Sequence, residues 1–166
     1  YDPATDTWTP TPHSGLAGRF VHTAIWTGQE MIIWGGLGGS PLEFHKSGGR
    51  YNPATDSWLP TSTVNVPAER AGHLAVWTGS KMVVWGGSGR EAAFMASGGR
   101  YNPASDIWEP TSEMGAPAGR YLSAGVWTGR RMLIWGGWGS GNPTLDTGST
   151  YDPENDTWSP MSAVGA

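Results

Sequence analysis

The pattern of hydrophobic and polar residues predicts short β-strands joined by turns. Arg19–Trp26 alternates between two faces, as a strand does when its two sides meet different surroundings. Met31–Trp34 is apolar throughout, which indicates a strand buried on both sides. Gly35 and Gly36 follow it, and paired glycines at a strand end indicate positive φ or a close approach of backbone.

Two further strands complete the unit. The loop Leu37–Lys46 is long and is expected to be irregular, and Ser47–Tyr51 then begins a third strand. A turn at Asn52-Pro53 leads to a short fourth strand around Trp58, because Asn or Asp before Pro suits the first positions of a type I turn. The unit is therefore a meander of four antiparallel strands, which we call A to D.

This unit recurs along the whole chain. The segment AIWTGQEMIIWGG at 24–36 returns at 75–87 and 125–137, and segments of the type YDPATDTW begin at Tyr1, Tyr51, Tyr101 and Tyr151. The period is 50 residues, which indicates a repeat architecture. Residues 1–166 are thus predicted to form one repeat region with no second domain, divided into a half unit and three full units at 1–10, about 19–60, 70–110 and 120–160.

Composition supports an all-β fold and excludes several functions. The chain has 26 Gly, 13 Pro and 11 Trp but only 14% charged residues, which suits short strands and turns better than helices. The net charge of −4 and the absence of a basic run argue against nucleic-acid binding. No cysteine is present, so disulfides and thiolate metal sites are excluded, and no apolar run has the length of a membrane span.

Apolar residues that lead into a double glycine, followed by a spaced Tyr and Trp, resemble kelch repeats. The R-x-x-H, WTG and WGG motifs are similar to kelch arrays of bacterial proteins, which favours a bacterial protein that is secreted or on the cell surface. The resemblance covers nearly all of the chain, in three full copies and a leading half. It implies a β-propeller whose blades are four-stranded antiparallel sheets around a central channel.

About three and a half blades do not close a propeller, which has about four to eight. A sheet that is apolar on both faces needs a neighbour on each side, so the two end blades would expose apolar surface. Either the chain associates with itself, two copies of three blades making a six-bladed ring, or it is part of a longer propeller. In a ring the leading hairpin 1–10 would be redundant with the trailing hairpin 151–160.

The meander separates repeated turns from variable loops. The A–B and C–D turns lie at one face of the blades and are nearly identical between copies, whereas the B–C loops LGGSPLEFHK, SGREAAFMAS and WGSGNPTLDT share little. Residues that differ between blades are free for recognition, so we expect any ligand site on the B–C/D–A face. Trp138, the only tryptophan outside the repeated positions, is a candidate platform there for a sugar or peptide, and Arg90 and Asn142 are polar candidates.

Arg19, Arg70 and Arg120 begin strand A in each unit. In ligand-binding kelch domains the matching arginines lie near the channel mouth, which makes these three residues candidates for contacts with acidic or carbonyl groups. The alternative is that they tie loop carbonyls together. Arg50 and Arg100 correspond to Thr150, and nothing in the sequence explains the replacement.

The sequence predicts no catalytic residue, metal site or cofactor. His22 and His73 correspond to Ser123, and no carboxylate pair or nucleophile–base spacing accompanies them. Kelch propellers include a copper-dependent sugar oxidase, whose Cys–Tyr cofactor cannot form here, and a sialic-acid mutarotase, which needs only a polar pocket. The expected function is non-catalytic binding of a protein, peptide or glycan through the loops. The alternatives are a self-assembling propeller fragment without a ligand and a mutarotase-like enzyme.

Overall fold

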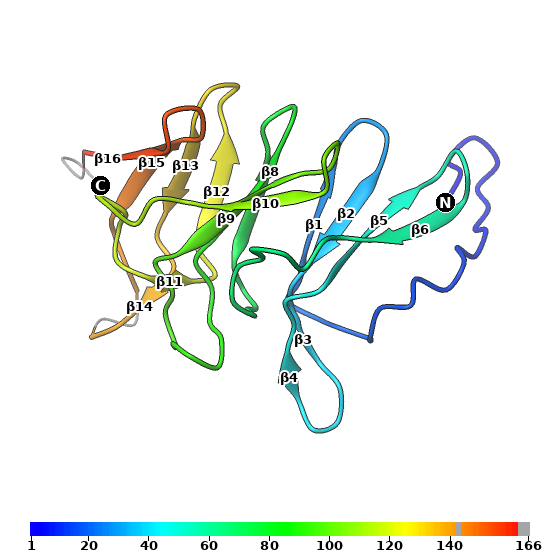
Figure 1. Cartoon of the computed structure of the whole chain (residues 1–166), viewed down its shortest axis with the longest axis horizontal. Helices are drawn as coiled ribbons and strands as arrows, with labels where there is room; N and C mark the ends of the chain where they lie inside the picture. The colour runs from blue at the N-terminus through cyan, green and yellow to red at the C-terminus, as the bar shows by residue number, and fades with distance from the viewer. Residues whose placement is uncertain (142–143, 163–166) are drawn as a thin grey trace.

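The computed structural model describes residues 1–141 and 144–162, and every regular element in that part of the chain is a β-strand. Three four-stranded antiparallel sheets stand side by side, with the two termini at opposite ends of the row (Figure 1). The first sheet contains β1 (Thr23–Trp26), β2 (Met31–Trp34), β5 (Gly48–Asn52) and β6 (Ser57–Pro60). The second contains β7 (Leu74–Trp77), β8 (Met82–Trp85), β9 (Gly98–Asn102) and β10 (Ile107–Pro110). The third contains β12 (Ala124–Trp127), β13 (Met132–Trp135), β15 (Gly148–Asp152) and β16 (Thr157–Pro160).

Each sheet has the predicted meander of strands A to D. Trp26 pairs with Met31 across the A–B turn, and Tyr51 pairs with Trp58 across the C–D turn. The first strands β1, β7 and β12 lie next to one another, as the inner strands of propeller blades do. The A–B hairpins project from one side of the row and the B–C loops from the other (Figure 1).

The first strand of each blade is shorter than the prediction, which began it at Arg19. β1 begins at Thr23 because Val21 has φ 54°, a left-handed conformation that interrupts an extended strand. Gly72 and Leu122 have φ 62° and 53° at the same place in the other blades. The residue before this kink leaves the sheet, and Phe20 pairs with Leu37 instead.

The B–C loops are also more regular than predicted. A small ribbon of β3 (Leu37–Gly38) and β4 (Glu43–Phe44) forms in the first blade. In the third blade β11 (Arg120–Tyr121) pairs with β14 (Trp138–Gly139), and the second blade has a single bridge between Ala71 and Ser88. These pairings bring the residue before each kink beside the residue after each double glycine.

The double glycines have both properties that the sequence predicts. Gly36 has φ 99°, and its amide donates to the Arg70 carbonyl of the next blade at 2.8 Å. A Cβ at this position would lie 2.8 Å from Cβ of His22. Glycine is required here because φ is positive and a side chain would meet His22 and the Phe20 carbonyl of the same blade.

The hydrophobic core lies between the sheets rather than within any of them. One cluster joins the first and second blades, and its fully buried members are Ile32, Trp34, Met82, Val84, Tyr101 and Trp108. The other joins the second and third blades through Leu74, Val76, Val83, Trp85, Met132, Ile134, Tyr151 and Trp158. We call these two contacts the seams. Each blade has a trailing face, which is turned toward the blade that follows it in sequence, and a leading face, which is turned toward the blade before it. Each seam joins the trailing face of one blade to the leading face of the next.

The two end blades have one covered and one uncovered face. All four residues of β8 in the middle blade are buried, whereas the burial on both sides predicted for Met31–Trp34 is found on one face only, because no blade of the described chain covers the other face. In β2 only Ile32 and Trp34 are buried, and in β13 only Met132 and Ile134. The leading face of the first blade and the trailing face of the third therefore expose apolar side chains, among them Trp26 at 53% and Val126 at 55%.

The leading hairpin, residues 1–10, is held loosely compared with the other C–D hairpins. It contains one bridge, between Asp2 and Thr7, and Tyr1 stacks on Trp8 with ring centroids 5.1 Å apart. Trp8 is 82% exposed, whereas its counterparts Trp108 and Trp158 are buried in the seams. Across the described residues there is no helix of the length and hydropathy needed to cross a membrane.

Candidate functional site

The B–C/D–A face carries an apolar hollow that spans the three blades. Each blade supplies the residue before its kink and the residue after its double glycine, and these six residues are Phe20, Leu37, Ala71, Ser88, Tyr121 and Trp138. Side chains of the B–C loops, including Phe44 and Phe94, complete the lining. The hollow has a volume of about 310 Å³, which is in the size range of small-ligand sites.

The hollow is lined mainly by aromatic and aliphatic side chains. Trp138 is 55% exposed and Phe20 is half exposed, so both rings present large faces to solvent. Its polar side-chain groups are the hydroxyls of Ser88 and Tyr121 and the indole N–H of Trp138, and no charged side chain belongs to it among the residues that the structure describes. Exposed aromatic groups around a concavity offer a place to bury an apolar group of a partner.

The structure places the candidates from the sequence in different surroundings. Trp138 lines the hollow. Arg90 does not line it. The Arg90 side chain is largely exposed, and its Nε lies 4.0 Å from Oε1 of Glu69. Asn142 lies outside the described residues.

Phe20 and Tyr121 are part of the hollow but were missed by sequence reasoning. The alternation pattern assigned Phe20 to one face of a continuous strand, and the kink at Val21 removes it from that strand. The available signal was variation, because the repeat position occupied by Phe20 and Tyr121 has Ala71 in the middle copy. Trp138 was identified in the same way, because its repeat position has Leu37 and Ser88 in the other two copies.

Arg19, Arg70 and Arg120 make the same contacts in their own blades. The Arg70 Nη1 donates to the carbonyls of Gly86 at 3.0 Å and Ser97 at 2.7 Å. Its Nε donates to the Ala68 carbonyl at 3.0 Å, and its Nη2 donates to the Ser97 hydroxyl at 3.2 Å. These bonds join the segment that precedes the kink to both ends of the B–C loop, so the three arginines position the loops that form the hollow.

Burial separates these arginines from solvent to different degrees. Arg70 is 1% exposed, and burial lowers its pKa to about 10, so it remains charged at neutral pH. Arg120 is equally covered and Arg19 is half-buried, and burial lowers the pKa of both. Their guanidinium donors point at carbonyl and hydroxyl oxygens of their own blades, and none of the three lines the hollow.

His73 lies at the first seam. The Nε2 of His73 is 2.8 Å from Oγ1 of Thr23 in the first blade, and the ring packs edge-on against Trp34 at 5.1 Å. Burial, together with the charges of Arg70 and His22, lowers the pKa of His73 to about 3, so the ring is neutral at physiological pH. In the described ranges no three His, Asp or Glu side chains gather in a way that could hold a metal ion.

A known family accounts for this combination of repeated blades and variable loops. The family model of the KLHDC2/KLHL20/DRC7 Kelch-repeats domain matches residues 21–166. The chain belongs to the kelch-repeat family. This confirms the resemblance inferred from the sequence motifs and the all-β propeller fold that it implies. No curated protein matches the chain.

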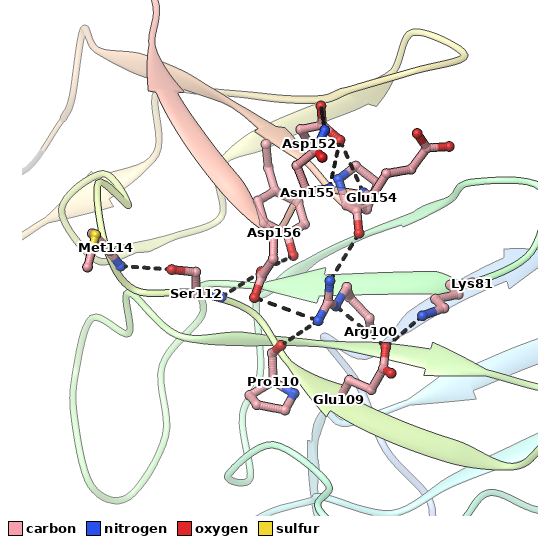
Figure 2. Close-up of polar contacts among 12 residues, drawn as sticks. Lys81, Arg100, Glu109, Pro110, Ser112, Met114, Asp152, Glu154, Asn155 and Asp156 are labelled. Carbon is pink, nitrogen blue, oxygen red and sulfur yellow. Dashed lines mark hydrogen bonds and ion pairs between the residues drawn. The ribbon is translucent and has the colours of Figure 1, made fainter.

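At the opposite face, the kelch blades are linked by charged side chains. Arg100 on β9 donates to the Pro153 carbonyl of the next blade at 3.0 Å, and its Nη2 lies 3.7 Å from Oδ2 of Asp156 (Figure 2). Figure 2 also shows Glu109 between Arg100 and Lys81, whose Nζ is 2.6 Å from the Glu109 carboxylate. Arg50 makes the equivalent bond in the first seam, to the Pro103 carbonyl at 2.6 Å.

Two polar clefts at this face are parts of the seams. They have volumes of about 680 and 500 Å³, and they are lined by A–B and C–D turns together with Arg50 in one and Arg100 in the other. Both are larger than the hollow, but each repeats the other at successive seams and is lined by the residues that join the blades. Repetition at every seam is what blade packing requires, so we place the candidate site at the unrepeated hollow.

Thr150 stands where the first two blades have an arginine that links the seams. It occupies the position of Arg50 and Arg100 in the third blade, the trailing face of which contacts no further blade of the described chain. Its hydroxyl lies 3.5 Å from the Ser159 carbonyl of its own blade. The first two blades carry an arginine that reaches forward across a seam, and the third does not.

Proposed function

We propose that this kelch module is a non-catalytic binding domain whose B–C/D–A face receives an apolar segment of a protein or peptide. The observation that carries the proposal is the hollow, which is built from positions that differ between the repeats. Kelch-repeat domains are in general scaffolds for protein interaction, in agreement with this reading.

The lining of the hollow favours a peptide over a glycan. A glycan needs several hydrogen-bond partners around its hydroxyl groups, and the polar side-chain groups of the described lining are limited to those of Ser88, Tyr121 and Trp138. An aromatic or aliphatic side chain, in contrast, is bound by burial against rings such as those of Trp138 and Phe20. The three buried arginines support the binding face indirectly, because they hold the loops in place.

A random peptide library selected on the chain tests this proposal. We expect the enriched peptides to carry aromatic or leucine side chains, and we expect Trp138→Ala to weaken their binding by about tenfold or more, the effect of a central aromatic contact. Trp8→Ala is the matched control, since Trp8 is a highly exposed tryptophan that does not line the hollow. Isothermal titration of one enriched peptide against the three proteins measures the difference.

Equal binding by the wild type and Trp138→Ala would contradict the proposed site. Binding on a glycan array, combined with no peptide enrichment, would instead favour the glycan ligand. The mutarotase-like alternative has no support from the lining, and sugar anomerisation followed by NMR in the presence of the chain tests it directly.

We also propose that another blade covers each of the two uncovered end faces. The support is their composition, because Trp26 and Val126 are exposed at positions whose equivalents in the middle blade lie in the seams. A second copy of the chain in a six-bladed ring or further blades of a longer propeller would supply such a cover.

A further inference from the structure

The two seams within the chain follow one plan. The trailing face of the second blade contributes Leu74, Val76, Val83 and Trp85, and the leading face of the third contributes Met132, Ile134, Tyr151 and Trp158. The first seam uses the same repeat positions. Both seams are formed by buried apolar side chains, so they define which apolar surfaces of this chain fit together.

The two end faces present the two halves of such a seam. On the trailing face of the third blade the four positions are Ala124, Val126, Leu133 and Trp135, and they surround an apolar depression of about 220 Å³. On the leading face of the first blade the corresponding positions are Met31, Ile33, Tyr51 and Trp58. The trailing face of the third blade uses the same repeat positions as the trailing faces inside the seams, and the leading face of the first blade uses the same positions as the leading faces inside the seams. The two end faces therefore correspond to the two surfaces that contact each other within the chain.

The backbone at the inner strands has the same polarity. The Gly72 amide donates to the Val21 carbonyl at 3.0 Å, and the Leu122 amide donates to the Gly72 carbonyl at 2.9 Å. This row of bonds runs in one direction and places the Val21 amide at one end and the Leu122 carbonyl at the other. The donor end of one copy can therefore bond the acceptor end of another copy, whereas two donor ends or two acceptor ends cannot pair.

The end faces lack some of the side-chain groups that link the internal seams. Arg50 and Arg100 reach across the internal seams, but Thr150 is too short to do so. The Trp108 indole donates to the Ser62 carbonyl at 3.1 Å, and the Ser62 amide donates to Asp106 at 2.8 Å. Pro12 occupies the Ser62 position before the first blade and has no amide, and the Trp58 indole nitrogen is buried without a partner among the described residues.

We propose that a second copy of this chain docks the leading face of its first blade on the trailing face of the third blade, and that two such seams close a six-bladed ring. The inference rests on the proposal that another blade covers the end faces, and it commits to a second copy as the source. The leading hairpin 1–10 is displaced from the first blade, because the partner's trailing hairpin 151–160 takes its position. Two copies with two identical head-to-tail seams satisfy both end faces of each copy and leave none open.

Light scattering after size exclusion tests the ring. We expect twice the chain mass of 17.6 kDa for the wild type and a single chain for Val126→Glu, which places a charge in the new seam. Val64→Glu is the matched control. Val64 is 68% exposed and lies outside both end faces, so this variant should remain a dimer. Thr150→Arg should lower the dissociation constant by about tenfold, because it restores a charge-assisted bond to the partner's Pro53 carbonyl.

Cross-linking tests the direction of docking. The chain has no cysteine, so Ala24→Cys and Ala124→Cys together introduce the only thiols. These positions correspond to Gly125 and Leu74, which meet in the second seam, where a Cβ on Gly125 would lie 2.5 Å from the Leu74 side chain. We expect oxidation to link two copies in the double variant and in neither single variant.

Any of three results would overturn the proposal. They are a wild-type mass of one chain, a Val126→Glu variant that remains dimeric, and a cross-link in the Ala124→Cys single variant, which would show that trailing faces meet each other. Thr150→Arg keeps the test decisive if Val126→Glu fails to fold. The seam is measured by mass and the loop site by peptide binding to Trp138→Ala, so either proposal can fail alone.

Discussion

Replacement of Arg70 by alanine tests whether the strand-A arginines serve the fold. The Arg70 side chain donates four hydrogen bonds to the Ala68, Gly86 and Ser97 carbonyls and the Ser97 hydroxyl while being 1% exposed. Arg70→Ala would leave these buried oxygens without a donor and would open a cavity.

The expected loss follows from these contacts. A hydrogen bond to a charged donor contributes about 1.5–3 kcal/mol, and bonds made by one side chain are not additive. Counting the four bonds as the equivalent of two, we expect Arg70→Ala to lower the free energy of unfolding by about 3–5 kcal/mol. Arg19 makes the same set of contacts but is half-buried, so water can replace its side chain, and Arg19→Ala should cost about 1–2 kcal/mol.

Urea unfolding followed by tryptophan fluorescence, at one fixed protein concentration, measures both variants. Arg70→Lys should recover part of the loss, because an ammonium can satisfy some acceptors but cannot reproduce the planar fork. A loss below about 1 kcal/mol for Arg70→Ala, or one no larger than that for Arg19→Ala, would refute the structural role. In that case the arginine would again be a candidate for direct ligand contact.

Two further predictions concern the seams and the sheets. The pKa of His73 is about 3 in the folded protein against an ordinary value of 6.5. Between pH 6.5 and pH 3 the imidazole is therefore protonated in the unfolded chain but neutral in the folded protein. Its contribution to stability is complete above pH 6.5 and is lost as pH falls toward 3, and we expect a loss of about 2 kcal/mol from pH 8 to pH 5. This loss should be smaller in His73→Gln and unchanged in the control His13→Gln, and equal acid sensitivity in all three proteins would contradict the assignment. For the sheets, Gly98→Ala should cost about 1–3 kcal/mol, because its Cβ would lie 2.2 Å from the Val84 carbonyl oxygen, whereas Gly18→Ala meets nothing within 4 Å and should be neutral in thermal unfolding.

The repeat architecture could be predicted from the sequence because its evidence is local and recurrent. The 50-residue period, the apolar run at Met31–Trp34 and the double glycine that follows it specify four strands per unit and a turn that only glycine can make. The sequence also separated the repeated turns from the variable B–C loops, and the assignment of a binding face to those loops stays a prediction. Trp138, which the sequence offered as a platform for a sugar or peptide, is an exposed residue of the hollow, and its role in binding stays a prediction.

The start of strand A could not be predicted, because alternation does not report a single left-handed residue. Val21 and Leu122 adopt positive φ although both carry Cβ, and in doing so they extend the hydrogen-bonded row between blades. This backbone conformation depends on hydrogen bonds across the seam, which joins residues about fifty positions apart. The pairing of Phe20 with Leu37, and therefore part of the hollow, depends on it.

The sequence by itself determined the blades, because each strand and turn depends on residues close along the chain. Only the tertiary structure decided what the repeated polar residues do. Arg70 and Arg100 look equivalent as repeated arginines, yet one ties a loop within its blade and the other reaches across a seam. The hollow likewise exists only where three blades meet, since packing brings Phe20, Tyr121 and Trp138 together from distant repeats.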